Sequence, residues 1–92
     1  MGEKIKMEVK IRGKYYTIIS DEPEEYIFKI CARVDRKVSE ICKINPRLGT
    51  EMSSILTAIN MTDEMCKAQA KTHELEVKVR ELEEKLRRAG IR

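Results

Sequence analysis

The chain has 92 residues, the length of one small domain, and 38% of them are charged against 41% hydrophobic. Only 4% are aromatic, which leaves little material for a large core and excludes a roomy active-site cavity. The net charge of +3 is too small to mark a dedicated nucleic-acid binder. No apolar run approaches the roughly 20 residues of a membrane span, and residues 1–11 alternate charged with apolar residues where a secretory signal is continuously apolar. These features predict a cytoplasmic protein.

The cysteines do not suggest a metal site or a disulfide framework. Cys31, Cys42 and Cys66 are odd in number and lack a Cys-x-x-Cys pair, and His73 is the only histidine. Each cysteine falls within an apolar helical pattern, where a free thiol behaves as a small hydrophobic side chain. We therefore expect no metal, no cofactor and a reducing compartment.

Residues 4–19 predict a β-hairpin. From Lys4 to Arg12 charged and apolar residues alternate strictly, as in a strand with one buried face. Gly13-Lys14 places a glycine first in a two-residue loop, which suits a type II′ turn, and residues 15–19 are aromatic or β-branched. The hairpin should present one apolar face.

A first helix should follow the hairpin. Ser20 or Asp21 can cap it, so that it begins near Glu22, and Asn45-Pro46 should end it. Its apolar stripe consists of Ile27, Ile30, Cys31, Val34, Val38 and Ile41, and can cover the hairpin. We expect a β-β-α head domain over residues 1–48. A head this small, without metal or disulfides, should depend on association with other chains.

Residues 49–92 predict one long helix that forms a coiled coil. Thr50 can cap it, and no proline or glycine interrupts it before Gly90, so that about 40 residues would extend roughly 60 Å. Apolar residues then recur in alternating steps of three and four, which is the spacing of a left-handed coiled coil. The resulting stripe comprises Ala58, Met61, Met65, Ala68, Thr72, Leu75, Val79, Leu82, Leu86 and Ala89. The fold class is thus α+β, a small head followed by an oligomerising helix.

The charges beside this stripe favour parallel pairing. If Ala58 is an a position, the later g positions are lysines (71, 78 and 85), and the e positions are Glu76 and Glu83. In a parallel dimer each g residue faces the following e residue of the partner, which pairs lysine with glutamate. An antiparallel dimer would instead oppose like charges.

A second, weaker apolar stripe leaves two interpretations open. It contains Leu56, Ile59, Cys66, Ala70, His73 and Val77. It can be a solvent-exposed surface on which scattered apolar residues are tolerated. Alternatively, it can be the face through which two dimers pack into a four-helix tetramer.

The order of several short motifs resembles one known family. The runs GKYYTI (13–18), EYI (25–27), ARVD (32–35), EI (40–41) and AINMTDEM (58–65) are similar to those of the ZapA family of bacterial cell-division proteins. The resemblance implies a non-enzymatic cytoplasmic protein at the division site that binds filaments of the tubulin-like GTPase FtsZ. It also implies bundling of those filaments through head pairs at the two ends of an antiparallel tetrameric rod.

The resemblance attributes filament binding to charged residues of the head, without a motif that assigns them individually. FtsZ surfaces are acidic in the family, so basic residues are the candidates. We expect the outer strand face, the turn, and the first helix with its flank to contribute. The candidates are Lys4, Lys6, Lys10 and Arg12 on the strand, Lys14 at the turn, and Arg33, Arg36, Lys37 and Arg47. Each of them can equally be an ordinary solvated side chain.

The sequence leaves two other classes of function open. A small nucleic-acid-binding oligomer could use the basic strand, with Tyr15 or Tyr16 stacking on a base. However, Glu8 interrupts the basic face of that strand, and the sequence contains no known nucleic-acid-binding motif. An enzyme is disfavoured because the sequence has no phosphate loop and no nucleophile beside a base. Binding to FtsZ without nucleic acid or membrane is the favoured prediction.

Overall fold

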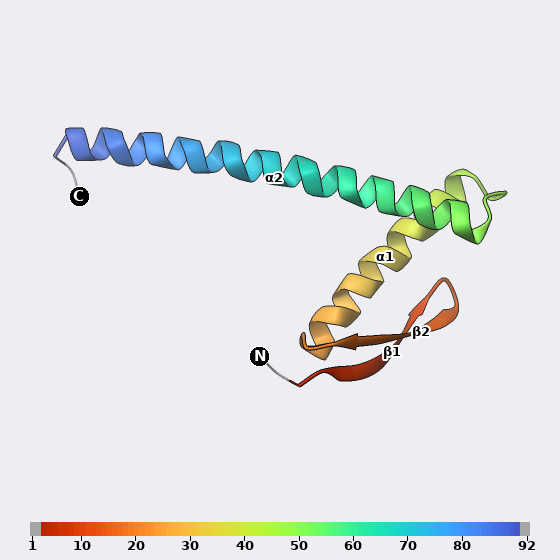
Figure 1. The fold of residues 1–92 in the computed structure, drawn as a ribbon. Coiled ribbons are helices and arrows are strands. Elements are labelled where there is room, and N and C mark those ends of the chain that lie inside the picture. Colours follow the sequence, from red (N-terminus) through yellow and green to blue (C-terminus); the bar gives the residue numbers. More distant parts are fainter. Residues whose placement is uncertain (1–2, 91–92) are drawn as a thin grey trace. The chain divides into compact units, whose positions relative to one another are not determined.

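The computed structural model describes residues 3–90 and consists of two strands followed by two helices (Figure 1). The elements are β1 (Ile5–Ile11), β2 (Lys14–Ser20), α1 (Glu24–Ile44) and α2 (Thr50–Arg88). This order confirms the predicted α+β fold, while residues 1–2 and 91–92 of the two expected domains lie outside the described residues. Contacts divide the chain into residues 1–58 and 59–92, so the first turns of α2 lie in the same unit as the hairpin and α1.

The hairpin forms as predicted, but its turn is one residue earlier. β1 and β2 are antiparallel, and Ile11 pairs with Lys14, so the loop is Arg12-Gly13 and not Gly13-Lys14. Both loop residues have positive φ, 52° at Arg12 and 80° at Gly13, which is the type I′ pattern and not the expected type II′. The Arg12 backbone N–H donates a 2.8 Å hydrogen bond to Asp35 Oδ1. A bond from α1, 23 residues away, therefore helps to hold a conformation that arginine disfavours.

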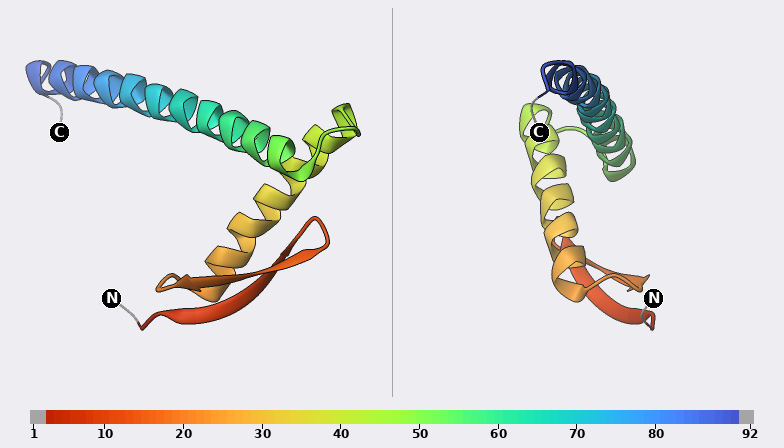
Figure 2. Two further views of the ribbon diagram at one scale, coloured as in Figure 1. Left: turned by 45° about the vertical axis from the view of Figure 1, so that its right-hand side comes forward. Right: turned by 90° about the vertical axis from the view of Figure 1, so that its left-hand side faces the viewer.

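α1 covers the apolar face of the hairpin (Figure 2). Met7 and Val9 of β1 form a small core with Ile27 of α1, and each of the three is less than a tenth exposed. Ile11, Ile18 and Cys31 pack against this core. No described side chain is buried below 2% exposure, consistent with a head that has few large side chains to bury.

The ends of α1 are formed by backbone groups and not by the expected side-chain cap. Pro23 occupies the N-cap position, and its carbonyl accepts hydrogen bonds from Tyr26 N and Ile27 N at 3.1 and 3.2 Å. Ser20 caps no helix, because its Oγ accepts a 3.0 Å bond from the Glu22 N–H in the preceding turn. The helix ends at Ile44, as the Asn45-Pro46 signal predicts.

α2 is continuous over its 39 residues, which confirms the predicted long helix. Its first helical residue is Thr50, so Gly49 and not Thr50 precedes the helix. Gly90, with a φ of 75°, donates its N–H to the Arg87 carbonyl and ends the helix as expected. Within residues 3–90, no helix combines the length and apolar character needed to cross a membrane.

Candidate interaction surfaces

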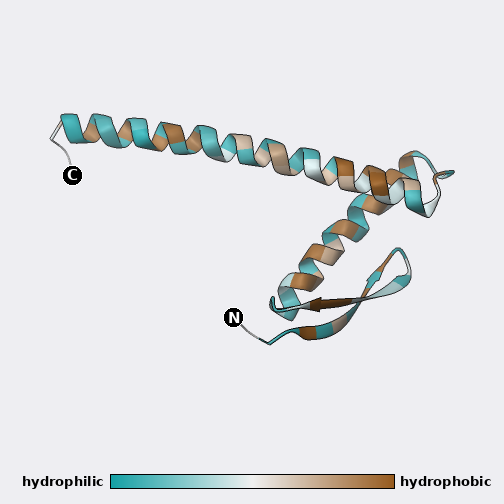
Figure 3. Ribbon diagram, in the orientation of Figure 1, coloured by the Kyte–Doolittle hydropathy of each residue, from teal (hydrophilic) through white to brown (hydrophobic). Residues whose placement is uncertain are grey.

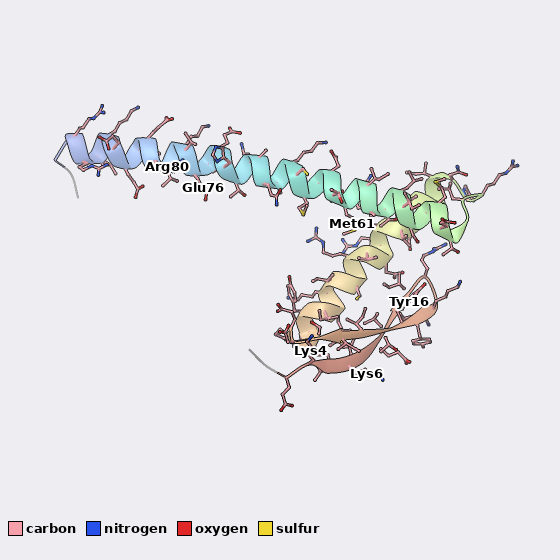
Figure 4. All side chains as sticks on the ribbon, viewed as in Figure 1. Lys4, Lys6, Tyr16, Met61, Glu76 and Arg80 are labelled. Atoms are coloured by element: carbon pink, nitrogen blue, oxygen red, sulfur yellow. The ribbon has the colours of Figure 1, made fainter. Side chains whose placement is uncertain are left out.

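The basic candidates on β1 form the first of three groups. Lys6 and Lys10 lie opposite Ile19 and Tyr15 on the side of the hairpin that faces away from α1. Lys10 Nζ lies 5.5 Å from the centre of the Tyr15 ring, within reach of a cation–π contact. Figure 4 labels Lys4 and Lys6 at the start of this hairpin. Lys4, Lys6 and Lys10, which we call the outer-strand group, are all exposed.

Arg12 and Lys14 do not belong to the outer strand face, which corrects the prediction for Arg12. Arg12 lies in the turn, and its Nη1 points toward α1, 3.4 Å from Ser39 Oγ. Lys14 is the first residue of β2 and shares the helix-facing side of the hairpin with its pairing partner Ile11. Arg12 and Lys14 form a second group, which we call the turn group.

The remaining candidates lie on α1 or follow it. Arg33 and Arg36 are exposed, and their helical positions place them away from the buried Ile27 and Val38. Lys37 is less exposed, and its Nζ lies 3.7 Å from Glu40 Oε2. Arg47 is exposed in the loop after α1, where its backbone N–H donates a 3.2 Å bond to Asn45 Oδ1. These four residues form a third group, which we call the helix group.

The nine candidates therefore do not form one continuous basic surface. The outer-strand group and the arginines of α1 lie on opposite sides of the head, since the core separates the hairpin from α1. The cations can be identified from the sequence, but their division among three groups depends on tertiary contacts. The separation also leaves the nucleic-acid alternative without the basic stripe that it needs.

A cavity of about 220 Å³ adjoins the turn group, and no sequence motif predicts it. Its apolar lining includes Ile11, Val38 and Leu48, and Tyr16 contributes an aromatic ring. The cavity lies within residues 1–58, between the hairpin tip, α1 and the first turn of α2. It is smaller than most small-molecule pockets, which occupy roughly 300 to 1,000 Å³.

The predicted coiled-coil stripe of α2 is uncovered in the single chain. Leu75, Val79 and Leu82 are 48, 54 and 59% exposed, and Figure 3 shows apolar residues recurring along the helix. An open depression of about 540 Å³ on this helix is lined by Thr72, Leu75 and Val79 together with polar neighbours, of which Figure 4 labels Glu76 and Arg80. An apolar stripe that is exposed to water destabilises a long helix. The helix becomes stable when another helix covers the stripe.

The charged side chains beside the stripe pair locally. Lys71 Nζ and Lys78 Nζ lie 3.7 and 3.8 Å from Glu74 Oε1 of the same helix. Such exposed pairs are worth about 0.3 to 0.5 kcal/mol each, so a partner helix can compete for either lysine.

Residues of the second stripe are also exposed, including Leu56 at 37% and Ile59 at 60%. Cys66 on this stripe is a free, exposed thiol, whereas Cys31 and Cys42 are half-buried. Within the described part of the chain, no cluster of three His, Cys, Asp or Glu side chains could hold a metal ion.

Comparison with known proteins identifies the family of this chain. The family model described as "Cell division protein ZapA" matches residues 7–91. The chain belongs to the ZapA family. The ZapA protein of Bacillus subtilis is 36% identical over 80 residues, which cover 87% of this chain and 94% of that protein. The ZapA protein of Bacillus velezensis is 35% identical over 82 residues, which cover 89% and 96%.

A solved structure has the same fold. It is described as a ZapA mutant dimer from Geobacillus stearothermophilus, and it matches with a TM-score of 0.69 at 28% identity. The match covers 87% of this chain and 93% of that chain. The likeness to a dimer and the uncovered stripe of α2 support a homo-oligomer of this ZapA-family protein.

Proposed function

We propose that this protein is a non-enzymatic cross-linker that binds FtsZ filaments and holds them in bundles at the division ring in the cytoplasm. Membership of the ZapA family supports a role in cell division. The observation that carries the cross-linking role is the uncovered a and d stripe on a helix of 39 residues. Such a helix connects heads into an assembly with several binding sites, and multiple sites are what bundling requires.

The proposed assembly starts from a parallel dimer. In that arrangement Lys71 and Lys78 exchange the intrahelical Glu74 for Glu76 and Glu83 of the partner. The main seam then buries Ala58, Met61, Met65, Ala68, Leu75, Val79, Leu82 and Leu86. Both heads of such a dimer lie at the same end of the coiled coil.

The proposed cross-linker is a tetramer of two such dimers packed antiparallel through the second stripe. Leu56, Ile59 and Ala70 are the residues that this packing would bury. Antiparallel packing places a pair of heads at each end of a rod of about 60 Å, which sets the spacing of neighbouring filaments. The basic residues of the head contact the filament, with acidic groups of FtsZ as their partners.

Sedimentation of polymerised FtsZ tests this proposal. The protein should pellet with filaments at high speed and should increase the pelleting of bundles at low speed. Reversing the charge of one basic group at a time, for example Lys4→Glu with Lys6→Glu or Arg33→Glu with Arg36→Glu, identifies the contact surface. At least one reversal should weaken co-sedimentation while the oligomeric mass stays unchanged. If the parent protein stays in the supernatant with filaments present, the proposed function is wrong.

A further inference from the structure

The side of the hairpin that faces away from α1 is exposed and carries both cations and apolar side chains. The core residues of β1 are buried toward α1, so Lys6 and Lys10 project to the opposite side. Cross-strand partners share one face of a sheet, and Lys6 pairs with Ile19 while Lys10 pairs with Tyr15. We call the surface made by three such pairs the outer hairpin face; it consists of Lys6, Glu8, Lys10, Tyr15, Thr17 and Ile19.

The large apolar side chains of the outer hairpin face are exposed to water. Tyr15 and Ile19 are each 64% exposed. Lys10 Nζ lies 5.5 Å from the centre of the Tyr15 ring, so an ammonium group and an aromatic ring lie side by side. A bilayer interface suits this combination, because tyrosine rings and lysine stems contact the apolar edge of the bilayer while ammonium groups reach the lipid phosphates.

The charged residues of this side of the hairpin favour an anionic partner. Lys6 and Lys10 lie on it, Lys4 is exposed just before β1, and Glu8 is the only carboxylate among residues 4–20. These cations are all lysines, which bind phosphate as point charges, whereas the planar fork of arginine suits paired contacts with the carboxylates of a protein. A second copy of the face is a poor partner, because lysines would oppose lysines. The composition therefore fits the many phosphates of a membrane surface better than one protein segment.

From these features we propose that the outer hairpin face docks on the surface of an anionic lipid bilayer. Lys6 and Lys10 pair with lipid phosphates, while Tyr15 and Ile19 enter the boundary between headgroups and acyl chains. Ile19 gains there apolar contacts that a nucleic-acid backbone does not offer. The contact is independent of FtsZ and goes beyond the proposed function, because it assigns the outer-strand group to lipid instead of the filament.

An interfacial contact needs no membrane-spanning segment, and none is found in the helices of residues 3–90. The expectation of no membrane partner was based on spanning segments and secretory signals, so it does not bear on a face built from two strands. One such face binds weakly, and two heads joined in a dimer would bind together and strengthen the contact.

The charge of the face is tested by Lys6→Glu with Lys10→Glu. The matched control is Lys29→Glu with Arg36→Glu, which changes the net charge equally at exposed positions of α1. Flotation at physiological salt, without FtsZ, measures binding of the purified proteins to two kinds of vesicle. One kind contains phosphatidylcholine alone, and the other contains phosphatidylglycerol as well.

The parent should float with the vesicles that contain phosphatidylglycerol and not with pure phosphatidylcholine. Each lysine close to an anionic surface contributes about fivefold to binding, so the reversal should weaken binding about tenfold or more. The control should stay within about threefold of the parent, because salt screens charges beyond roughly 8 Å. Failure of the parent to float with anionic vesicles, or equal losses in the variant and the control, would overturn the inference.

The apolar part of the contact is tested by Tyr15→Thr with Ile19→Thr, since threonine keeps strand propensity and the net charge stays the same. The variant should keep the parent's oligomeric mass and bind anionic vesicles severalfold more weakly. Parent-like binding would show that these side chains do not enter the bilayer, and the inference would be wrong.

The orientation of the head on the bilayer is tested with tryptophan fluorescence, because the chain has no tryptophan. Ile19→Trp places a reporter on the outer hairpin face, and Phe28→Trp places one at an exposed position of α1. Anionic vesicles should shift the emission of Ile19→Trp to shorter wavelength and protect it from quenching by acrylamide, with little change for Phe28→Trp. The same response at both positions, or none at position 19, would contradict the inference.

Filament binding separates this inference from the proposed function. In the absence of lipid, Lys6→Glu with Lys10→Glu should co-sediment with polymerised FtsZ like the parent. If this variant loses filament binding, the face is a filament contact and the inference is wrong, although the proposed function stands. A parent that binds anionic vesicles but no filaments would leave the inference standing and refute the proposed function.

Discussion

Arg12 carries an unusual backbone conformation for its residue type. Its φ of 52° lies in the left-handed region, which costs a non-glycine residue roughly 1 to 2 kcal/mol. The bond from its N–H to Asp35 Oδ1 offsets part of this cost, because hydrogen bonds to charged acceptors are worth about 1.5 to 3 kcal/mol. Asp35 thus acts as a brace between α1 and the hairpin tip.

We predict that Asp35→Ala lowers the free energy of unfolding of the head by about 1 to 2 kcal/mol. Asp35→Asn keeps an acceptor oxygen and should lose less than half as much. Tyrosine fluorescence during urea unfolding reports on the head, because all three tyrosines precede residue 27. Protein concentration is held constant, since association changes apparent stability. Equal losses in the two variants would show that the acceptor does not matter.

The secondary-structure elements that follow from a periodic pattern of apolar residues were predicted correctly from the sequence. The alternation in β1 and the spacing of three and four in α2 identify a strand and a helix without knowledge of the fold. The turn was misplaced because arginine rarely adopts positive φ, so the local rule favoured glycine as the first loop residue. The error shifts the strand pairing by two residues, so Tyr16 still faces α1, but opposite Val9 instead of Ile11.

The candidate site was less predictable than the elements. All nine cations could be listed from composition, but their separation into three groups depends on contacts between residues distant in sequence. The bond between Arg12 and Asp35 is one such contact, and the cavity is another feature of this kind. Neither has a local sequence pattern.

The α2 stripe gives a prediction about association. Leu82→Ala should raise the dissociation constant of the oligomer at least tenfold, because removal of a buried leucine side chain costs about 2 to 5 kcal/mol. Glu81→Ala is the matched control, as Glu81 is an exposed residue of the same helix at a c position, on neither apolar stripe. Sedimentation equilibrium over a range of concentrations measures both. Identical curves for the two variants would contradict burial of Leu82.

The charge pattern of α2 gives a second prediction. Lys71→Glu with Lys78→Glu should weaken self-association at low salt, because these residues would then face Glu76 and Glu83 of the partner. The same variant should pair with a counterpart that carries Glu76→Lys and Glu83→Lys. Mass measurements on the separate proteins and on the mixture test both expectations.

Glu74→Gln controls for the loss of intrahelical pairs. It removes the local partner of both lysines, so it should leave the oligomeric mass unchanged if the pairs between chains set the orientation. If the doubly acidic variant self-associates like the parent at low salt, the charge pattern does not select the parallel dimer.

Assembly of several chains is what would allow this protein to bundle filaments. A parallel dimer has both heads at one end and can bind a filament, but a tetramer with heads at two ends is required to join separate filaments. α2 is one continuous helix from Thr50 to Arg88. The second stripe is the surface on which this proposal depends.

The most direct test is the effect of Ile59→Glu on bundling. The change buries a charge in the proposed contact between dimers but leaves the a and d seam intact, so the tetramer should dissociate into dimers. Co-sedimentation with FtsZ at high speed measures filament binding, low speed measures bundles, and oligomeric mass is determined on the same samples. We predict a dimer that still pellets with filaments at high speed and no longer increases pelleting at low speed. A dimer that bundles FtsZ as fully as the parent would contradict the account.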